Sequence, residues 1–296
     1  MLSILIPTYR YNALPLVASL HQQAIAANIT FEVICFDDGA TEEFNIENKK
    51  INALSNAHFE SLKTNVGLSQ NRNLLAQKSQ YDYLLFIDGD SEIPDVDFIA
   101  NYVNQLPKKG IIYGGRIHPK TRPEKHQQLR WKYGLLKEDK VADLRSKTPY
   151  RCLLFNNALI EKTSFERIGF SKEIRTYGHE DTLFAYHAQK NAIPITHINN
   201  PVSHKDIDSN KMYLQKTQMG LQNLKRLYEQ QKIEAHFVTL LKYFEFLKKS
   251  NLLALFTRFF RFFEVMMLQN LKSSKPSLFI FDVYKLGYFC GLNTKK

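Results

Sequence analysis

Apolar residues in the first third of the chain follow two patterns, short unbroken runs and longer stripes with helical spacing. A run of four to eight apolar residues bounded by turn residues is typical of a buried strand, and apolar positions three or four apart are typical of an amphipathic helix. The patterns predict strands at residues 2–9, 31–36, 58–62 and 83–87, and helices at 12–28, 42–54 and 69–78, the last capped by Ser69. Strands that alternate with helices predict an α/β fold with a mostly parallel sheet.

The pattern becomes less regular in the middle of the chain and helical towards its end. Apolar runs predict further strands at 110–115, 152–160 and 194–198, and a glycine followed by two acids opens a helix that reaches about residue 190. Two helical stripes follow residue 204, at 211–232 and 236–268, before an apolar tail. The chain is therefore predicted to have an α/β part followed by a helical part.

Polar residues follow three of the predicted strands at the points where those strands end. They are residues 7–9, 37–38 and 88–90. Ligands bind at the carboxyl ends of the strands in open parallel sheets, so these residues are candidates for one site. Gly89 lets the backbone turn between Asp88 and Asp90, and two nearby carboxylates commonly hold a cation or share a proton. The alternative is an ordinary polar turn, because Asp and Gly are common in turns.

The sequence contains neither of the common glycine-rich phosphate loops. No G-x-G-x-x-G motif follows the first strand, and no G-x-x-x-x-G-K-[ST] motif occurs. This argues against a dinucleotide oxidoreductase and against a P-loop NTPase. A bound nucleotide would then need another means of phosphate neutralisation, which a divalent ion at Asp90 could provide.

Charge changes the interpretation of the C-terminal third. The 296 residues carry a formal net charge of +11. Residues 1–204 hold 24 Lys/Arg and 22 Asp/Glu, a net of +2, whereas residues 205–296 hold 16 and 7, a net of +9. Such a basic excess suits nucleic acid, anionic lipid or an anionic substrate. No nucleic-acid-binding motif is recognisable, so no nucleic acid is expected as a partner.

The cysteines and the N-terminus predict a cytoplasmic protein. The three cysteines form neither a disulfide framework nor a metal-ligand spacing, and the first residues lack a basic stretch typical of a signal peptide. The stripe at 252–268 is interrupted by Arg258, Arg261 and Glu264, so it is not a membrane span. A basic, aromatic-rich helix of this kind can lie peripherally on the inner face of a membrane. The alternative is packing on the α/β part of the chain or on a second subunit of an oligomer.

Four short motifs occur in a recognisable order along residues 1–204. They are ILIPTY at 4–9, DDGAT at 37–41, NVG with NRN within 65–73, and DGD at 88–90. Together they resemble the motifs of the family-2 glycosyltransferases. The resemblance implies a GT-A fold over residues 1–204, with a Rossmann-like mixed, mostly parallel sheet flanked by helices. Residues 205–296 would then be a helical C-terminal extension.

The resemblance also implies a donor site and a metal site. Tyr9 would pack on the base, one of Asp37 and Asp38 would accept from a base N–H, and the other would orient the loop. Asp90 would ligate Mn²⁺ or Mg²⁺, completed by His204, for which a solvated loop histidine is the alternative. The full set of residues implied for the nucleotide and the donor is Pro7, Thr8, Tyr9, Asp37, Asp38, Asn65, Arg72, Asp88 and Gly89.

The acceptor side is implied to include the acidic pair after Gly178. Asp181 resembles the general base that removes a proton from the acceptor hydroxyl, and Glu180 a binding or orienting carboxylate. Two acids in a first helical turn also satisfy the helix dipole, which is the alternative for both. The residues expected to contact the acceptor or the sugar are Trp131, Asn156, Asn157 and His179, with Trp131 as a packing aromatic in the alternative.

These implications predict an inverting, metal-dependent glycosyltransferase. It would move a sugar from a nucleotide diphosphosugar, a UDP-sugar in the first instance, to a hydroxyl of a glycan or lipid-linked acceptor in surface polysaccharide biosynthesis. A Gln-x-x-Arg-Trp motif does not follow the acidic pair, which favours a single transfer over polymerisation. The alternative is a non-catalytic nucleotide- or sugar-binding protein with a degenerate site.

Overall fold

The computed structural model of the chain describes residues 1–204 and 207–292, which form two compact units. Within those residues, unit 1 comprises 1–119, 139–175 and 180–204, and unit 2 comprises 120–138, 176–179 and 207–292. The longest continuous stretch of unit 2 begins at residue 207. Two short stretches before it, 120–138 and 176–179, also pack within unit 2.

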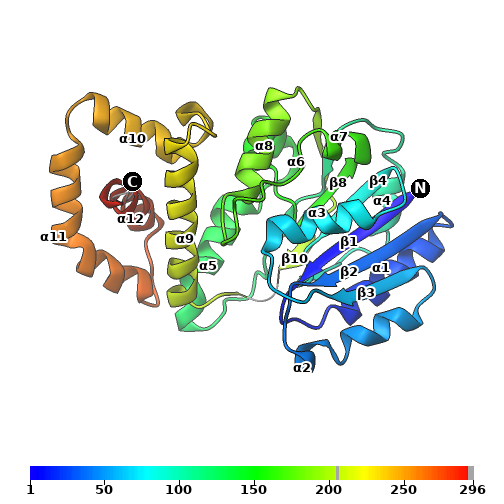
Figure 1. The fold of residues 1–296 in the computed structure, drawn as a ribbon. Coiled ribbons are helices and arrows are strands. Elements are labelled where there is room, and N and C mark those ends of the chain that lie inside the picture. The colour runs from blue at the N-terminus through cyan, green and yellow to red at the C-terminus, as the bar shows by residue number, and fades with distance from the viewer. Residues whose placement is uncertain (205–206, 293–296) are drawn as a thin grey trace. The chain divides into compact units, whose positions relative to one another are not determined.

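Unit 1 is built on a seven-stranded sheet with the strand order β3-β2-β1-β4-β8-β6-β9 (Figure 1). The strands are β1 (Leu2–Thr8), β2 (Phe31–Asp37), β3 (Ala57–Ser61), β4 (Tyr83–Ile87), β6 (Ile111–Tyr113), β8 (Asn157–Glu161) and β9 (Ile195–His197). Strand β8 runs antiparallel to both of its neighbours, and the other neighbouring pairs are parallel. The expected mixed, mostly parallel sheet is therefore confirmed.

Helices cover the sheet, which explains why its strands are apolar without alternation. All seven residues of β1 are buried, as a strand packed on both faces requires. Figure 1 shows α1 and α3 on opposite faces of the sheet. The helical elements of unit 1 are α1 (Leu14–Ala26), α2 (Glu42–Asn45), η1 (Asn48–Ala53), α3 (Leu68–Lys78), α4 (Phe98–Val103), α6 (Ala142–Ser146), η4 (Tyr150–Cys152), α7 (Lys162–Glu166) and α8 (Glu180–Lys190).

Two local predictions in this region were wrong. The segment 42–54 forms α2 and the 3-10 helix η1 instead of one helix, and Asn48 at the start of η1 donates to Tyr11 O and accepts from Ala13 N at 2.9 and 2.8 Å. These bonds hold η1 against the segment that joins β1 to α1. Helix α3 begins at Leu68 with Gly67 as its N-cap at φ +85°, so Ser69 lies inside its first turn and is not the cap. A Cβ on Gly67 would lie 2.8 Å from the carbonyl oxygen of Arg175, which explains the glycine at this position.

A second, three-stranded sheet lies beyond the end of β4. It has the order β5-β10-β7, formed by β5 (Ser91–Glu92), β10 (Val202–His204) and β7 (Arg116–Ile117). Strands β5 and β10 are antiparallel, and His204 stands opposite Ser91. This register brings His204 next to the 88–90 motif, although more than a hundred residues separate them in the chain.

Unit 2 is helical and has a core of its own. Its elements are η2 (Lys125–Gln127), α5 (Gln128–Tyr133), the π-helix η3 (Gly134–Glu138), α9 (Asn210–Glu229), η5 (Ala235–Phe237), α10 (Thr239–Lys249), α11 (Leu253–Lys272) and α12 (Leu278–Gly291). The buried cluster consists of Leu129, Leu214, Phe260, Leu271, Phe281 and Tyr284. Helix α5 thus supplies Leu129 to a core built mainly from the C-terminal helices.

The stripe expected as one helix at 236–268 is broken into α10 and α11. Asn251 lies between them in the left-handed region at φ +58°, a conformation that ends a helix and that Asn tolerates better than most residues. Helices α11 and α12 then pack closely, since a Cβ on Gly287 would lie 2.1 Å from Cδ2 of Phe260. None of the helices in the described residues is long and apolar enough to cross a bilayer.

We expect His197 on β9 to make the stability of the protein depend on pH. Its Nδ1 accepts from Arg145 Nε at 3.2 Å and its Nε2 donates to Pro149 O at 3.1 Å, so the neutral ring fits the site. Burial, with a smaller contribution from Arg145, lowers the pKa of His197 to about 4. The unfolded chain, with a pKa near 6.5, binds this proton more readily, so stability is lost as the pH falls from about 6.5 to about 4, by up to about 1.4 kcal/mol per pH unit.

The measurement is urea unfolding of wild type and His197→Gln at pH 7, 6 and 5. The glutamine can accept from Arg145 and donate to Pro149 without titrating, so its unfolding free energy should fall less steeply with acid. Replacing the exposed His58 by Gln in the same way is the control for a histidine-to-glutamine change at the surface. Equal slopes for wild type and His197→Gln would contradict the assignment.

Candidate functional site

The three strand-end motifs of unit 1 form one continuous surface. The backbone N–H of Asp38 donates to Thr8 O at 2.9 Å, and that of Gly89 donates to Pro7 O at 3.0 Å. A Cβ on Gly89 would lie 2.8 Å from the Cβ of Thr8, so only glycine allows the loop after β4 to approach β1 this closely. The structure therefore brings together Pro7, Thr8, Asp38 and Gly89, as expected from the carboxyl ends of neighbouring parallel strands.

Tyr9 presents an accessible ring at this surface. Its side chain is 45% exposed, whereas Thr8 beside it is buried. The guanidinium carbon of Arg10 lies 5.1 Å from the centre of the Tyr9 ring, a cation–π distance that restrains the ring. An exposed aromatic ring held in this way is suited to stacking on a flat ligand group.

Asp37 and Asp38 both support the loops around the site. Oδ2 of Asp37 accepts from Ala40 N, Asn45 Nδ2 and Ser61 Oγ at 2.7 to 3.0 Å, and Asp37 is 0% exposed.

The two oxygens of Asp38 accept from the backbone N–H groups of Val66 and Gly67 at 2.7 and 3.0 Å. Burial raises the pKa of Asp38, which these two hydrogen bonds oppose. Asp38 thus orients the loop that carries Asn65, which is exposed.

Arg72 joins two carboxylates that are far apart in the sequence. It extends from α3, is 1% exposed, and donates from Nη2 to Asp88 Oδ1 at 2.8 Å and from Nη1 to Asp181 Oδ1 at 2.7 Å. Its guanidinium carbon also lies 5.1 Å from the ring centre of Phe170. Burial by itself would lower the pKa of Arg72, but Asp181, Asp88 and Glu180 together raise it above its usual value. Arg72 is therefore permanently charged and is not a solvated helix residue.

Asp181 stands at the start of α8 with both carboxylate oxygens engaged. Besides the ion pair with Arg72, its Oδ2 accepts from the backbone N–H of Phe155 at 3.1 Å. Burial raises the pKa of Asp181, with a further contribution from Asp88, while Arg72 and the Phe155 N–H act in the opposite direction. Glu180 precedes it in the first turn and is half-buried. The arrangement gives one carboxylate with raised basicity and a fixed orientation.

Asp90 and His204 lie side by side beyond the end of β4. Asp90 Oδ2 is 3.7 Å from His204 Nδ1, and the two side chains are 38% and 19% exposed. One carboxylate and one imidazole are suitable donors for a divalent ion, which commonly takes its remaining ligands from substrate phosphates and water. The described residues contain no cluster of three or more His, Cys, Asp or Glu side chains arranged for a metal. The donor set therefore fits an ion shared with a substrate.

His118 lies near this pair and was missed by the sequence analysis. Its Nδ1 donates to Asp139 Oδ1 at 2.6 Å, and its backbone N–H donates to Asp139 Oδ2 at 2.9 Å. Its ring centre is 6.0 Å from that of His204. A carboxylate that fixes the tautomer of a histidine is a common support beside metal sites. A single histidine in a polar segment carries no local signal that could have identified it.

The two asparagines expected at the sugar pocket differ in their availability. The backbone carbonyl of Asn156 accepts from Asp88 N at 3.3 Å, which places Asn156 at the site, and its buried Oδ1 has no hydrogen-bond partner among the described residues. Asn157 is 0% exposed, accepts from the Tyr102 hydroxyl at 2.6 Å, and donates to the carbonyl oxygens of Gly115 and Asn200. The side chain of Asn157 therefore has a structural role and is not available to bind a sugar hydroxyl.

The remaining two candidates belong to unit 2. Trp131 lies on α5 and is half-buried. His179 has a left-handed backbone at φ +69°, and burial, with a smaller contribution from Lys285, lowers the pKa of His179 to about 4. Its ring is therefore neutral at pH 7. A histidine exposed to solvent would keep a pKa near 6.5.

Comparison with known sequences identifies one family. The family model described as Glycosyl transferase family 2 matches residues 3–169. A Haemophilus influenzae protein described as an uncharacterized glycosyltransferase is 33% identical over 120 residues, which are 38% of this chain and 38% of that protein. The match therefore spans well under half of the relative's length.

Comparison with solved structures finds the same fold in two proteins solved in complex with nucleotide sugars. S. aureus TarS 1-349 in complex with UDP-GlcNAc has a TM-score of 0.52 and 20% identity, covering 77% of this chain and 72% of that one. The mannosyltransferase PcManGT from Pyrobaculum calidifontis, in complex with GDP-Man and Mn²⁺, also has a TM-score of 0.52, with 16% identity over 77% and 64% of the two chains. At these identities the likeness concerns the fold, and it agrees with the expected GT-A architecture.

Proposed function

This chain belongs to glycosyltransferase family 2, and from that premise we propose that it transfers a sugar from a nucleotide diphosphosugar to an acceptor hydroxyl with inversion and with the help of a divalent ion. The observation that carries the proposal is the convergence of Asp88 and Asp181 on the buried Arg72, beside the pair Asp90 and His204. The donor we propose is a UDP-sugar, and the acceptor a glycan or a lipid-linked glycan of surface polysaccharide biosynthesis.

The donor would lie across the ends of β1, β2 and β4. Tyr9 offers its exposed ring to the base, and one of Asp37 and Asp38, which are 0% and 5% exposed, would accept from a base N–H while the other orients the loop. Thr8 and Gly89 form the floor between them. The structural neighbours named with UDP-GlcNAc and GDP-Man support a nucleotide sugar as the ligand class.

A divalent ion would be held by Asp90 and His204. When bound there, it would neutralise charge on the diphosphate that leaves with the nucleotide. Asp88 lies in the same loop, and its ion pair with Arg72 keeps its carboxylate turned towards the acceptor side of the site. The neighbour named with GDP-Man and Mn²⁺ supports manganese as the first ion to test.

Asp181 would act as the general base. Its carboxylate would take the proton of the acceptor hydroxyl while that oxygen bonds to the anomeric carbon and the bond from that carbon to the diphosphate oxygen breaks. A pKa raised by burial increases the basicity of Asp181, and the bonds from Arg72 Nη1 and Phe155 N hold its two oxygens in a fixed orientation. Glu180 would contact or orient the acceptor.

A thermal-shift panel tests the donor and metal proposals together. We expect one class of nucleoside diphosphate or nucleotide sugar to stabilise the wild-type chain only when Mn²⁺ or Mg²⁺ is present. At a ligand concentration of one hundred times Kd, binding adds about 2.7 kcal/mol of stability. Asp90→Asn and His204→Gln should lose the metal-dependent part of this shift, because each removes one ion ligand.

The control is Asp82→Asn, which changes an exposed carboxylate at the opposite end of β4 and should keep the full shift. No shift with any nucleotide would contradict the donor site. A shift that needs no metal would contradict the role of Asp90 and His204. Donor binding without transfer and without donor hydrolysis would favour the alternative of a binding protein with a degenerate site.

A further inference from the structure

Helix α11 of unit 2 carries an exposed apolar stripe that its own core does not use. Leu255, Phe259, Phe262 and Met266 are 67%, 48%, 80% and 59% exposed. Their spacing of four, three and four residues puts them on one face of the helix. The opposite face buries Phe260 and Leu271, which belong to the unit 2 core. The packing of α11 is therefore complete without the stripe.

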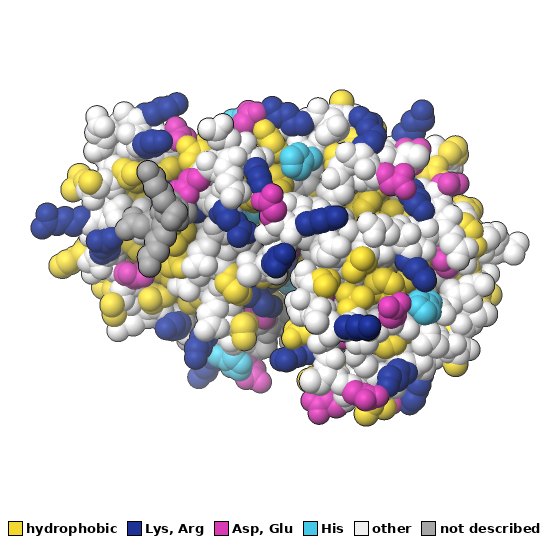
Figure 2. All heavy atoms as spheres, viewed as in Figure 1, with side chains coloured by type: hydrophobic (Ala, Val, Ile, Leu, Met, Phe, Trp, Pro, Cys, Tyr) yellow, Lys and Arg dark blue, Asp and Glu magenta, His cyan; other side chains and the backbone are white. Residues whose placement is uncertain are grey.

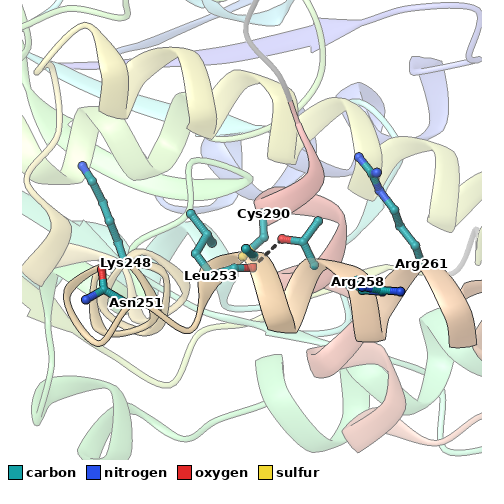
Figure 3. A pocket seen from close by; sticks show the side chains of 8 residues that line it. Lys248, Asn251, Leu253, Arg258, Arg261 and Cys290 are labelled. Carbon is teal, nitrogen blue, oxygen red and sulfur yellow. Dashed lines mark hydrogen bonds between the residues drawn. The ribbon is translucent and has the colours of Figure 1, made fainter.

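A cavity with positive charge lies along one flank of the same helix. It has a volume of about 800 Å³ and is lined by Lys248, Asn251, Leu253, Ala254, Thr257, Arg258, Arg261 and Cys290. Figure 3 shows Lys248 and Arg261 extending to the same side from the two ends of this cavity. Three of the lining side chains are cationic and none is acidic. The cavity is thus suited to an anion.

The two arginines are available to an external anion. Within residues 1–204 and 207–292, neither Arg258 nor Arg261 forms an ion pair with a carboxylate, and Lys248 reaches Glu245 only at 4.0 Å. Helix α10 repeats the combination, with Tyr243 and Phe246 exposed beside exposed lysines. In Figure 2, apolar and basic side chains lie together at the left edge of the view, where Figure 1 places α11.

We propose that α10 and α11 form a docking surface for an anionic phospholipid bilayer. The stripe of α11 would enter the boundary between headgroups and acyl chains, while Lys248, Arg258 and Arg261 contact lipid phosphates. Aromatic and aliphatic residues on one face, with cations at its edge, are the combination by which helices lie in the membrane interface. Anionic lipid surfaces attract such cations by about 1 kcal/mol per residue.

Charge favours a bilayer over a second copy of this chain as the occupant. Residues 205–296 carry 16 Lys/Arg against 7 Asp/Glu. Pairing two copies through this face would bring like charges together, which is unfavourable at an interface, whereas an anionic bilayer is complementary in charge.

Vesicle flotation of the full chain tests the proposal. We expect wild type to float with phosphatidylcholine vesicles that contain 30% phosphatidylglycerol and not with phosphatidylcholine alone. Phe259→Ser with Phe262→Ser should weaken partitioning more than tenfold, because two exposed rings no longer enter the interface. Arg258→Gln with Arg261→Gln should weaken it about 30-fold, since two cations near the surface are lost.

Two matched controls separate the surface from general effects. Val96→Ser removes an exposed apolar residue of unit 1, and Lys78→Gln with Lys109→Gln removes two exposed cations of unit 1, so both variants should float like wild type. All variants are compared for circular dichroism and urea unfolding, because the substituted positions are exposed and should leave the fold intact.

Three outcomes would overturn the proposal. The first is equal flotation of wild type and both α11 variants. The second is a wild-type chain that does not bind vesicles and is a dimer in light scattering, with Phe262→Ser a monomer. That result would make the stripe a contact between two copies of the chain. The third is binding of free inorganic phosphate or glycerol phosphate without binding of vesicles, which would make the cavity a site for a soluble anion. None of these readouts depends on the transferase activity.

Discussion

Arg72→Met is expected to lower the free energy of unfolding by about 3 to 5 kcal/mol, because it leaves the carboxylates of Asp88 and Asp181 without the cation they share. Arg72 is 1% exposed, and its two ion pairs are 2.8 and 2.7 Å long. Methionine fills much of the same volume, so loss of packing is kept small. Urea unfolding at pH 8 measures the effect.

The deficit of this variant should shrink in acid. Burial already raises the pKa of Asp181, and Arg72 opposes that effect. Without Arg72 the folded carboxyl binds its proton more tightly than the unfolded one, whose pKa is near 3.9, so the variant loses stability as the pH rises through the folded pKa. Unfolding at pH 5 should therefore show a smaller difference from wild type than at pH 8.

Lys50→Met is the matched control for the charge removed. It breaks an ion pair with Glu47 in which the two side chains are 61% and 47% exposed, and we expect a change within about 0.5 kcal/mol. Arg72→Lys keeps the charge but not the two-pronged geometry, and should lie between wild type and Arg72→Met. An Arg72→Met chain as stable as wild type would show that the two carboxylates do not need their cation.

Asp181→Asn should reduce the rate of sugar transfer about 10³-fold while leaving donor affinity within threefold of wild type. The amide keeps the shape of the side chain and can still accept from Arg72, but it cannot take the proton of the acceptor hydroxyl. The measurement is release of nucleoside diphosphate in the presence of acceptor, with the nucleotide sugar that the thermal-shift panel identifies. Donor affinity is measured by the thermal shift itself.

Two further variants show whether the loss is specific to the proposed base. Glu180→Gln alters the neighbouring acid and should cost about tenfold if Glu180 orients the acceptor, and Asp82→Asn should change nothing. Urea unfolding distinguishes loss of chemistry from loss of fold, since Asp181 also contributes to the Arg72 ion pairs. Full transfer activity in Asp181→Asn would move the role of base to another residue.

Much of the fold and part of the site were predictable from local sequence. Strands such as β1 are short apolar runs because both faces of the sheet are covered, and this burial is visible in the sequence itself. Gly67 and Gly89 stand where the backbone passes too close to a neighbouring segment for a side chain to fit. The carboxyl ends of parallel strands meet at one edge of the sheet. The motif at 88–90 could therefore be placed beside residues 7–9 from the sequence alone.

Other features depend on contacts between residues that are distant in the chain. Asp181 is bound to Arg72 across 109 positions, His204 reaches Asp90 through the register of β10 on β5, and Asp139 orients His118 from a separate loop. The sequence by itself determined the α/β sheet, the family motifs and the basic C-terminal third, because periodicity and turn residues act locally. The tertiary structure decided which acids share the cation of Arg72, which asparagine side chain is fully engaged in structural hydrogen bonds, and which face of α11 stays exposed. Burial and pairing of this kind are set by packing between elements, and no local pattern specifies them.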